Sequence, residues 1–219
     1  SSPCRNSSIT ISANGPVSLI ADSIVMTTGS QVTSGGLITI AGLGNVTLAQ
    51  VRSTYDPSSP TVVIAVTAGG AILSSDNNQT NIVANKAHSL VSLLATNGIG
   101  SLTNRVSFDA TSLSATANSG NITIRGATSL HATLLSAVYG SVDVRGSASL
   151  QLDSVLAGTA TGASGTFTAD ATGPMNIGTA TSSGSQTISA AQNVAFGQLT
   201  TSGIAGDAGD VLVTAGSIQ

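Results

Sequence analysis

The amino-acid sequence predicts an all-β fold, a right-handed parallel β-helix of about nine or ten coils with roughly 20–25 residues in each. Three observations predict it: a strand pattern that repeats along the chain, a second apolar strand at a constant distance after the first, and a composition that disfavours helices. The 219 residues are 41% hydrophobic but only 2% aromatic and 7% charged, with no Glu and a single Lys, Lys86. Exposed helix positions normally carry Glu, Lys, Gln and Arg, so this composition favours strands.

The first strand of the repeat begins with a small residue, and apolar residues then alternate with variable ones. It reads SSITISA from Ser7, GLITIAG from Gly36, VVIAVTA from Val62, GNITIRG from Gly120, GSVDVRG from Gly140, GTFTADA from Gly165, GSQTISA from Gly184 and GDVLVTA from Gly209. Successive copies begin at similar intervals, except between Val62 and Gly120, where the interval is at least twice as long as any other. Residues 75–116 lie in that long interval, so we expect irregular coils of uncertain register there, within a single β-helix segment that covers residues 1–219.

A second apolar strand follows ten and twelve residues after each of the first seven starts. The pairs are Val17 and Leu19, Val46 and Leu48, Ile72 and Ser74, Leu130 and Ala132, Leu150 and Leu152, Met175 and Ile177, and Val194 and Phe196, and all of these residues except Ser74 are apolar. A third apolar position, fifteen residues after the start, is found at Val51, Leu135, Val155 and Leu199. A β-sandwich also has short alternating strands, but it does not need constant offsets between them, so the spacing favours a solenoid.

Alternation assigns each side chain of the coils that begin at Gly120 and Gly140 to the core or to the outside. The expected core residues are Ile122, Ile124, Leu130, Val142 and Val144, and the expected outward residues are Thr123, Arg125, Asp143 and Arg145. We therefore expect Ile124→Asp to unfold its neighbourhood and Thr123→Asp to be nearly silent. Gly or Ser at the start of most coils is typical of corners that need close backbone approach or a positive φ.

Charge and hydropathy exclude several classes of protein. Six scattered basic residues and a net charge of −3 do not suit a run of phosphates, so we expect no nucleic-acid partner. No run reaches the ~18 apolar residues of a membrane span, and no charged-then-apolar leader is present, so we expect no membrane insertion and a mature or excised chain. The single cysteine, Cys4, cannot form an internal disulfide; it either links subunits or is an ordinary tail residue.

No group of polar residues is typical of catalysis, so we expect no enzyme activity, no cofactor, and no catalytic, cofactor-binding or metal-binding residue. The Asp residues are dispersed over the whole chain, at Asp22, Asp56, Asp76, Asp109, Asp143, Asp153, Asp170, Asp207 and Asp210. Asp143, beside Arg125 and Arg145, is expected to be solvated or in an exposed salt bridge. Asp207 and Asp210 superficially resemble a calcium nonapeptide, but the required spacing is not met and no second copy exists.

Several other residues have an ordinary interpretation that competes with a functional one. His88 and His131 have no partner at ligand spacing and are interpreted as surface histidines. Asn6, Asn45, Asn78 and Asn121 match the N-glycosylation acceptor pattern, which chance explains in a repeat rich in Asn and Thr. Outward Thr residues could order water as in ice-binding β-solenoids, but Ala65, Asp143 and Ala195 interrupt them.

The chain resembles the β-helical repeat shaft of filamentous haemagglutinin-like exoproteins, the large adhesins of two-partner secretion systems. The similar stretches are GNITIRGATSL, GSVDVRGSASLQL, SQTISAAQNVAFGQLTTSG, AGGAIL (68–73) and NGIGSLTNRVSFDATSLSATANSGNITI (97–124), the last of which resembles a connecting unit of such proteins. The resemblance covers nearly the whole chain and implies a secreted protein of the bacterial cell surface. It carries over no functional residue, and the family's N-terminal secretion module is not recognisable in residues 1–49.

The predicted function is therefore a structural shaft segment of a large secreted adhesin, which gives reach and stiffness and binds host-cell or surface ligands, if any, through loops such as Ser53–Pro60. The alternative is a self-assembling extracellular filament or sheath subunit, and a third candidate is an ice-binding solenoid. The coil that begins at Gly209 stops before its second strand is complete, and open solenoid ends expose unpaired strand edges. We therefore expect neighbouring β-helix segments or subunits to meet end to end.

Overall fold

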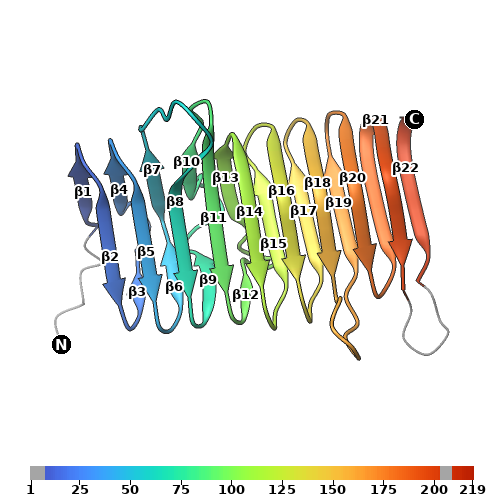
Figure 1. Ribbon diagram of the computed structural model, residues 1–219, viewed down its shortest axis with the longest axis horizontal. Coiled ribbons are helices and arrows are strands. Elements are labelled where there is room, and N and C mark those ends of the chain that lie inside the picture. Colours follow the sequence, from blue (N-terminus) through green and yellow to red (C-terminus); the bar gives the residue numbers. More distant parts are fainter. Residues whose placement is uncertain (1–7, 203–208) are drawn as a thin grey trace.

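The computed structural model describes residues 8–202 and 209–219, and within them the chain forms 22 strands and no helix. All pairs of hydrogen-bonded strands are parallel, and they wind into about nine turns of a β-solenoid. In Figure 1 the strands nearest the viewer run downward and each later coil lies to the right, which is the right-handed sense preferred by parallel crossovers. The predicted fold class is confirmed.

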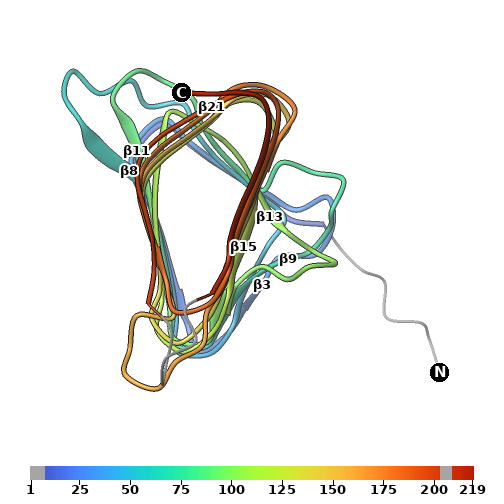
Figure 2. The same ribbon diagram turned by 90° about the vertical axis from the view of Figure 1, so that its right-hand side faces the viewer.

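Three faces surround the core in the first half of the chain, which has an elongated, roughly triangular cross-section (Figure 2). We name them the front, lower rear and upper rear faces after their places in Figure 1. The front face contains β2 (Val17–Ala21), β5 (Ile38–Gly42), β8 (Thr61–Ala68), β11 (Ser89–Ala95), β14 (Ser112–Ala117), β16 (Leu130–Ala137), β18 (Leu150–Ala157), β20 (Met175–Ser182) and the second half of β21 (Gln186–Thr201). The lower rear face contains β3 (Ile24–Val25), β6 (Val46–Leu48), β9 (Ala71–Ser74) and β12 (Gly98–Ile99). The upper rear face contains β1 (Thr10–Ala13), β4 (Gln31–Ser34), β7 (Gln50–Ser53), β10 (Ile82–Ala84) and β13 (Val106–Ala110).

The two rear faces merge at β15 (Ile122–Gly126). Its residue Ile122 pairs with β12 and its residue Ile124 pairs with β13, so a single strand continues both columns. β17 (Val142–Gly146), β19 (Phe167–Ala171), the first half of β21 and β22 (Val211–Ile218) continue the merged rear face. Early coils therefore have three strands and later coils have two. Coil length also varies along the front face, because Ile64 of β8 pairs with Val91, whereas Met175 of β20 pairs with Val194, which is nearer in the sequence.

The strand motifs that the sequence analysis treated as equivalent do not all lie in one column. GLITIAG and VVIAVTA form β5 and β8 of the front face, whereas GNITIRG forms β15 of the merged rear face and SSITISA contributes β1 of the upper rear face. The predicted equivalence is wrong in this respect. The cause is that period-2 alternation reports which side of a strand faces the core, but not which column the strand joins.

Residues 75–116 form strands that continue these columns. β11 pairs with β8 on one side and with β14 on the other, so the long interval between Val62 and Gly120 contains two further front strands. The register shifts between Leu90 and Val91, where β11 meets β8, and again between Leu113 and Ser114, where β14 meets β16. Such irregularities locally bend a strand without ending the column.

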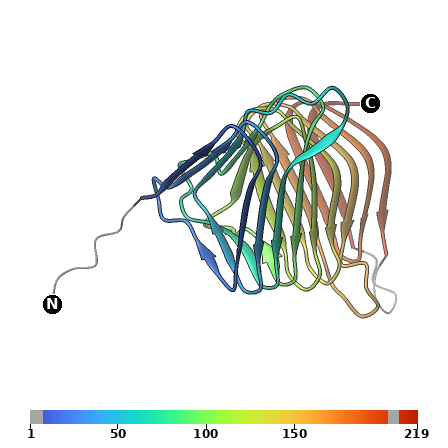
Figure 3. The same cartoon turned by 60° about the vertical axis from the view of Figure 1, so that its left-hand side comes forward.

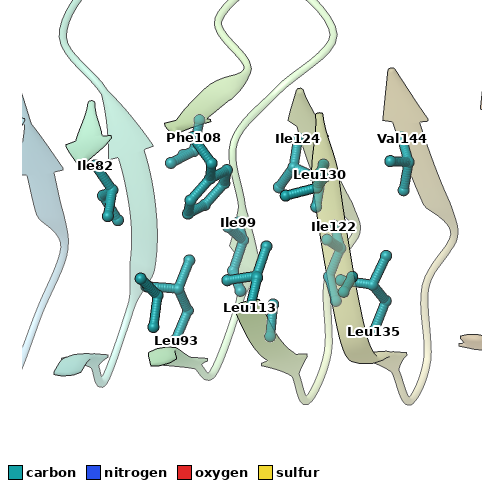
Figure 4. Packing of buried hydrophobic residues seen from close by; sticks show 14 of the residues in the cluster. Ile82, Leu93, Ile99, Phe108, Leu113, Ile122, Ile124, Leu130, Leu135 and Val144 are labelled. Atoms are coloured by element: carbon teal, nitrogen blue, oxygen red, sulfur yellow. The ribbon is translucent and has the colours of Figure 1, made fainter. Parts of the chain in front are cut away.

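The core is one stack of apolar side chains that follows the solenoid axis (Figure 4). The residues that alternation placed inside, Ile122, Ile124, Leu130, Val142 and Val144, are each at most 1% exposed, which confirms their assignment. Each buried aliphatic side chain of this size contributes about 1.5–3 kcal/mol. Phe108 is fully buried and is the register partner of Ile82 in the preceding coil and of Gly126 in the next.

Two glycines mark corners that admit no side chain. A Cβ at Gly120, where a coil starts, would lie 1.2 Å from the carbonyl oxygen of Asn97. Gly100 follows β12 with a φ of +69°, and a Cβ there would lie 2.1 Å from the carbonyl oxygen of Thr123. At these corners the backbones of neighbouring coils lie too close together for a side chain between them. This close approach was expected for Gly120, which starts a coil.

Candidate functional site

Asp143 on β17 forms an ion pair with Arg105, which lies in the connection between β12 and β13. The Arg105 Nη1 donates to Oδ1 of Asp143 at 2.7 Å, and Nη2 donates to Oδ2 at 2.9 Å. The two side chains are only 6% and 19% exposed, so water screens the pair weakly. The sequence predicted a solvated or exposed Asp143 beside Arg125 and Arg145. The structure corrects both points, because the partner is Arg105 and the pair is largely buried.

The same connection, residues 100–105, covers Thr123. Thr123 is the register partner of Asp143 and occupies an outward position, but it is only 3% exposed. Leu102 lines, together with Thr123 and Asp143, a cavity of about 290 Å³. The exposure on which the expectation of a nearly silent Thr123→Asp rested is therefore absent, and we now expect this substitution to destabilise the fold, since a second carboxylate would lose water beside Asp143.

A polar network ties the rear connections to the merged sheet. Arg125 donates from Nε to Oγ of Ser107 at 3.2 Å and from Nη2 to the carbonyl oxygen of Asn77. Asn81, in the connection between β9 and β10, is fully buried. Asn81 was not predicted to have a role, because nothing in the sequence distinguishes it from Asn77 and Asn78 in the same connection.

His131 on β16 and Asp153 on β18 form a hydrogen bond, which is an ion pair when the imidazole is protonated. The distance from Nε2 of His131 to Oδ2 of Asp153 is 2.7 Å, and Nε2 of Gln151 donates to Oδ1 at 3.1 Å. The His131 and Asp153 side chains are 33% and 45% exposed. Partial burial acts to raise the pKa of Asp153, but hydrogen bonds from His131 and Gln151 and the charge of His131 outweigh it and hold this pKa below its ordinary value.

Asp153 should therefore contribute a small stability that depends on pH. Because folding lowers the pKa of Asp153, its contribution is present above the ordinary value of 3.8 and is lost as the pH falls through the lower folded value. We expect Asp153→Asn to reduce the free energy of unfolding at neutral pH by less than about 1 kcal/mol, since water screens the pair. Urea denaturation from neutral pH to strong acid should show the two stabilities converging; a constant difference would contradict this account.

The connections at the upper edge of the front face extend beyond the outline of the solenoid (Figure 2). Residues 54–60 join β7 to β8 and include the exposed side chain of Tyr55, and residues 85–88 join β10 to β11. The two connections meet where the backbone N–H of Thr61 donates to the carbonyl oxygen of His88 at 3.0 Å. The loop Ser53–Pro60 is thus an exposed projection beside a second one, and His88 is exposed with a φ of 64°.

The other candidate residues named from the sequence either form hydrogen bonds between coils, are exposed, or lie outside the described residues. Oδ1 of Asn45 accepts from the N–H of Ala71 at 2.8 Å, and Oδ1 of Asn121 accepts from the N–H of Ser141 at 2.9 Å, so both join neighbouring coils at corners. Asn78 and Asp210 are exposed. Cys4, Asn6 and Asp207 lie outside the described residues. In the described ranges, no three His, Cys, Asp or Glu side chains lie together as a candidate metal site.

Comparison of the chain with protein-family models, with curated proteins and with solved structures found no match. No helix long and apolar enough to cross a membrane occurs in the part of the chain that the structure describes.

Proposed function

We propose that the chain is a structural shaft segment of a large secreted adhesin of the bacterial cell surface. The observation that carries the proposal is the apolar core, one cluster of buried side chains that extends from Val17 to Val194. It fills the stack of coils that Figure 1 shows. With a strand spacing of about 4.8 Å, nine coils give a rod of roughly 43 Å. A rod whose coils stack mainly on their neighbours can be lengthened by adding coils, which suits a spacer. The resemblance of its repeats to filamentous haemagglutinin-like shafts supports the same role.

The mass of the native polypeptide under denaturing conditions tests this proposal directly. A shaft segment belongs to a polypeptide far larger than the 21.3 kDa of these 219 residues, and external protease should release it from intact cells. A native polypeptide of about this mass would overturn the shaft and would favour a filament or sheath subunit.

Removal of one whole coil tests whether the rod acts through its length. Deletion of residues 150–174 joins Ser149 to Met175, the register partner of Leu150, so β16 can pair with β20 and β17 with β21. We expect this variant to fold, with a similar melting temperature and a rod shorter by about 4.8 Å in small-angle scattering. Deletion of residues 150–161, about half a coil, is the control and should unfold the chain because it breaks the register. If both deletions lower the melting temperature equally, a whole coil cannot be removed without loss of stability, and the rod is not built from interchangeable coils.

A further inference from the structure

Few charged side chains lie on the front face. In the described residues, only His131 and Asp153 are titratable on the strands of this face, and they are paired with each other. Other charged side chains, such as Arg52, Asp109 and Asp170, lie on the rear strands, and Lys86 lies in a connection. The front face is thus a broad parallel sheet that is almost free of charge, whereas the chain as a whole has a net charge of −3.

Most outward side chains of the front face are small, hydroxyl-bearing or apolar. One register row runs from Ile20 through Ala41, Thr67, Leu94 and Thr116 to Ser136. Ile20 and Leu94 are 78% and 45% exposed, and both line a groove of about 310 Å³ that crosses β2, β5, β8 and β11. Exposed apolar side chains that gather in a groove indicate a contact surface rather than a solvated one.

We infer that two copies of this chain associate through their front faces. Nine strands spaced about 4.8 Å apart, with about five residues across each, give an area on the order of 700 Å², close to the ~800 Å² that each partner buries in a typical stable interface. The front strands lie side by side and can pack on a second sheet about 10 Å away (Figure 3). The face is therefore large enough for a pair of solenoids.

A second copy suits this surface better than other occupants. In a two-fold symmetric dimer, the front face of one copy packs against the front face of the other. Asp or Lys side chains on such a face would be costly, because they would approach the same charges on the partner. Ser and Thr hydroxyls both donate and accept hydrogen bonds, so identical rows can satisfy one another. Leu94, Leu134 and Leu156 interrupt the hydroxyls at irregular places on this face, which does not suit the regular lattice of ice.

Sedimentation velocity of the 219-residue chain, from micromolar to millimolar concentration, tests the inference. We expect a reversible dimer, and we expect Leu94→Lys to weaken it at least about tenfold, because it places a cation in the groove and, across the axis, near its own copy. The control is Thr187→Lys on the merged rear face, which is also exposed and should dimerise as the unmodified chain does. Thr67→Lys, on the adjacent strand of the same row, repeats the test if Leu94→Lys lowers the melting temperature.

The outcomes are distinct from those for the shaft. A chain that stays monomeric at all concentrations overturns the lateral dimer, as does a Leu94→Lys variant that folds and still associates like the unmodified chain, which would indicate end-to-end contact. Neither result affects the shaft, which the native polypeptide mass tests separately.

Discussion

Ile124→Asp is expected to unfold the coils around β15. Ile124 is fully buried between its register partners Val106 and Val144, so the substitution removes about 1.5–3 kcal/mol of apolar burial. It also places a carboxylate in the apolar core, and the combined loss should exceed about 4 kcal/mol. Because strand pairing joins each coil to its immediate neighbours, the damage should be greatest in β13, β15 and β17.

Thermal denaturation followed by circular dichroism and amide hydrogen exchange measures this effect. Thr187→Asp is the matched control, since Thr187 lies on the outward side of the same merged face and is exposed. We expect its melting temperature to stay within a few degrees of that of the unmodified chain, consistent with surface substitutions of about 0.5 kcal/mol or less. Equal shifts in both variants would mean that the inward and outward assignment is wrong.

The inward residues could be predicted because burial repeats with the simplest period in the chain. Ile122, Ile124 and Leu130 alternate with polar neighbours, and only side chains that point to the core must be apolar in each coil. Stacking of Ile122 on Val142 also followed from the sequence, because consecutive coils of nearly equal length bring equivalent residues together. A local pattern therefore sufficed wherever the coils are regular.

The column that a strand joins could not be predicted from the same pattern. ITIAG of β5 and ITIRG of β15 read alike, although they lie on opposite faces of the solenoid. Both need alternate apolar residues, and the sequence does not state how many corners separate them. Here the early coils have an extra corner between the two rear faces, which the later coils lack.

The polar contacts near the place where the two rear faces merge join residues that are far apart in the sequence. The sequence therefore did not predict them. Arg105 reaches Asp143, which is far along the sequence, from a connection that has no counterpart in the later coils. The register placed Thr123 outward correctly, but the cover provided by residues 100–105 cannot be read from the strand that it covers. Connections outside a repeat therefore decide which outward residues remain exposed.

Asn81 is expected to hold three coils together at this corner. Its Nδ2 donates to the carbonyl oxygens of Leu48 and Ala49 at 3.1 and 2.9 Å, and its Oδ1 accepts from the N–H of Ser107 at 2.9 Å. Asn81→Leu keeps a similar volume but removes all three bonds from a site that water does not reach. The carbonyl oxygen of Leu48 still accepts from the N–H of Ser75 at 2.8 Å, so the substitution deprives two groups of their partner, the carbonyl oxygen of Ala49 and the N–H of Ser107. Since each unsatisfied buried group costs about 1–3 kcal/mol, we expect a loss of at least about 2 kcal/mol.

Equilibrium denaturation in urea measures the loss, and Asn78→Leu is the control from the same connection, because Asn78 is exposed. Asn81→Asp separates hydrogen bonding from packing: at neutral pH its carboxylate cannot donate to the two carbonyl oxygens and repels them. At acidic pH the protonated carboxyl can donate once, so this variant should gain stability relative to Asn81→Leu as the pH falls. If Asn81→Leu and Asn78→Leu are equally stable, the corner is held by its backbone pairing alone, through bonds such as the one from the N–H of Val51 to the carbonyl oxygen of Asn81 at 2.7 Å.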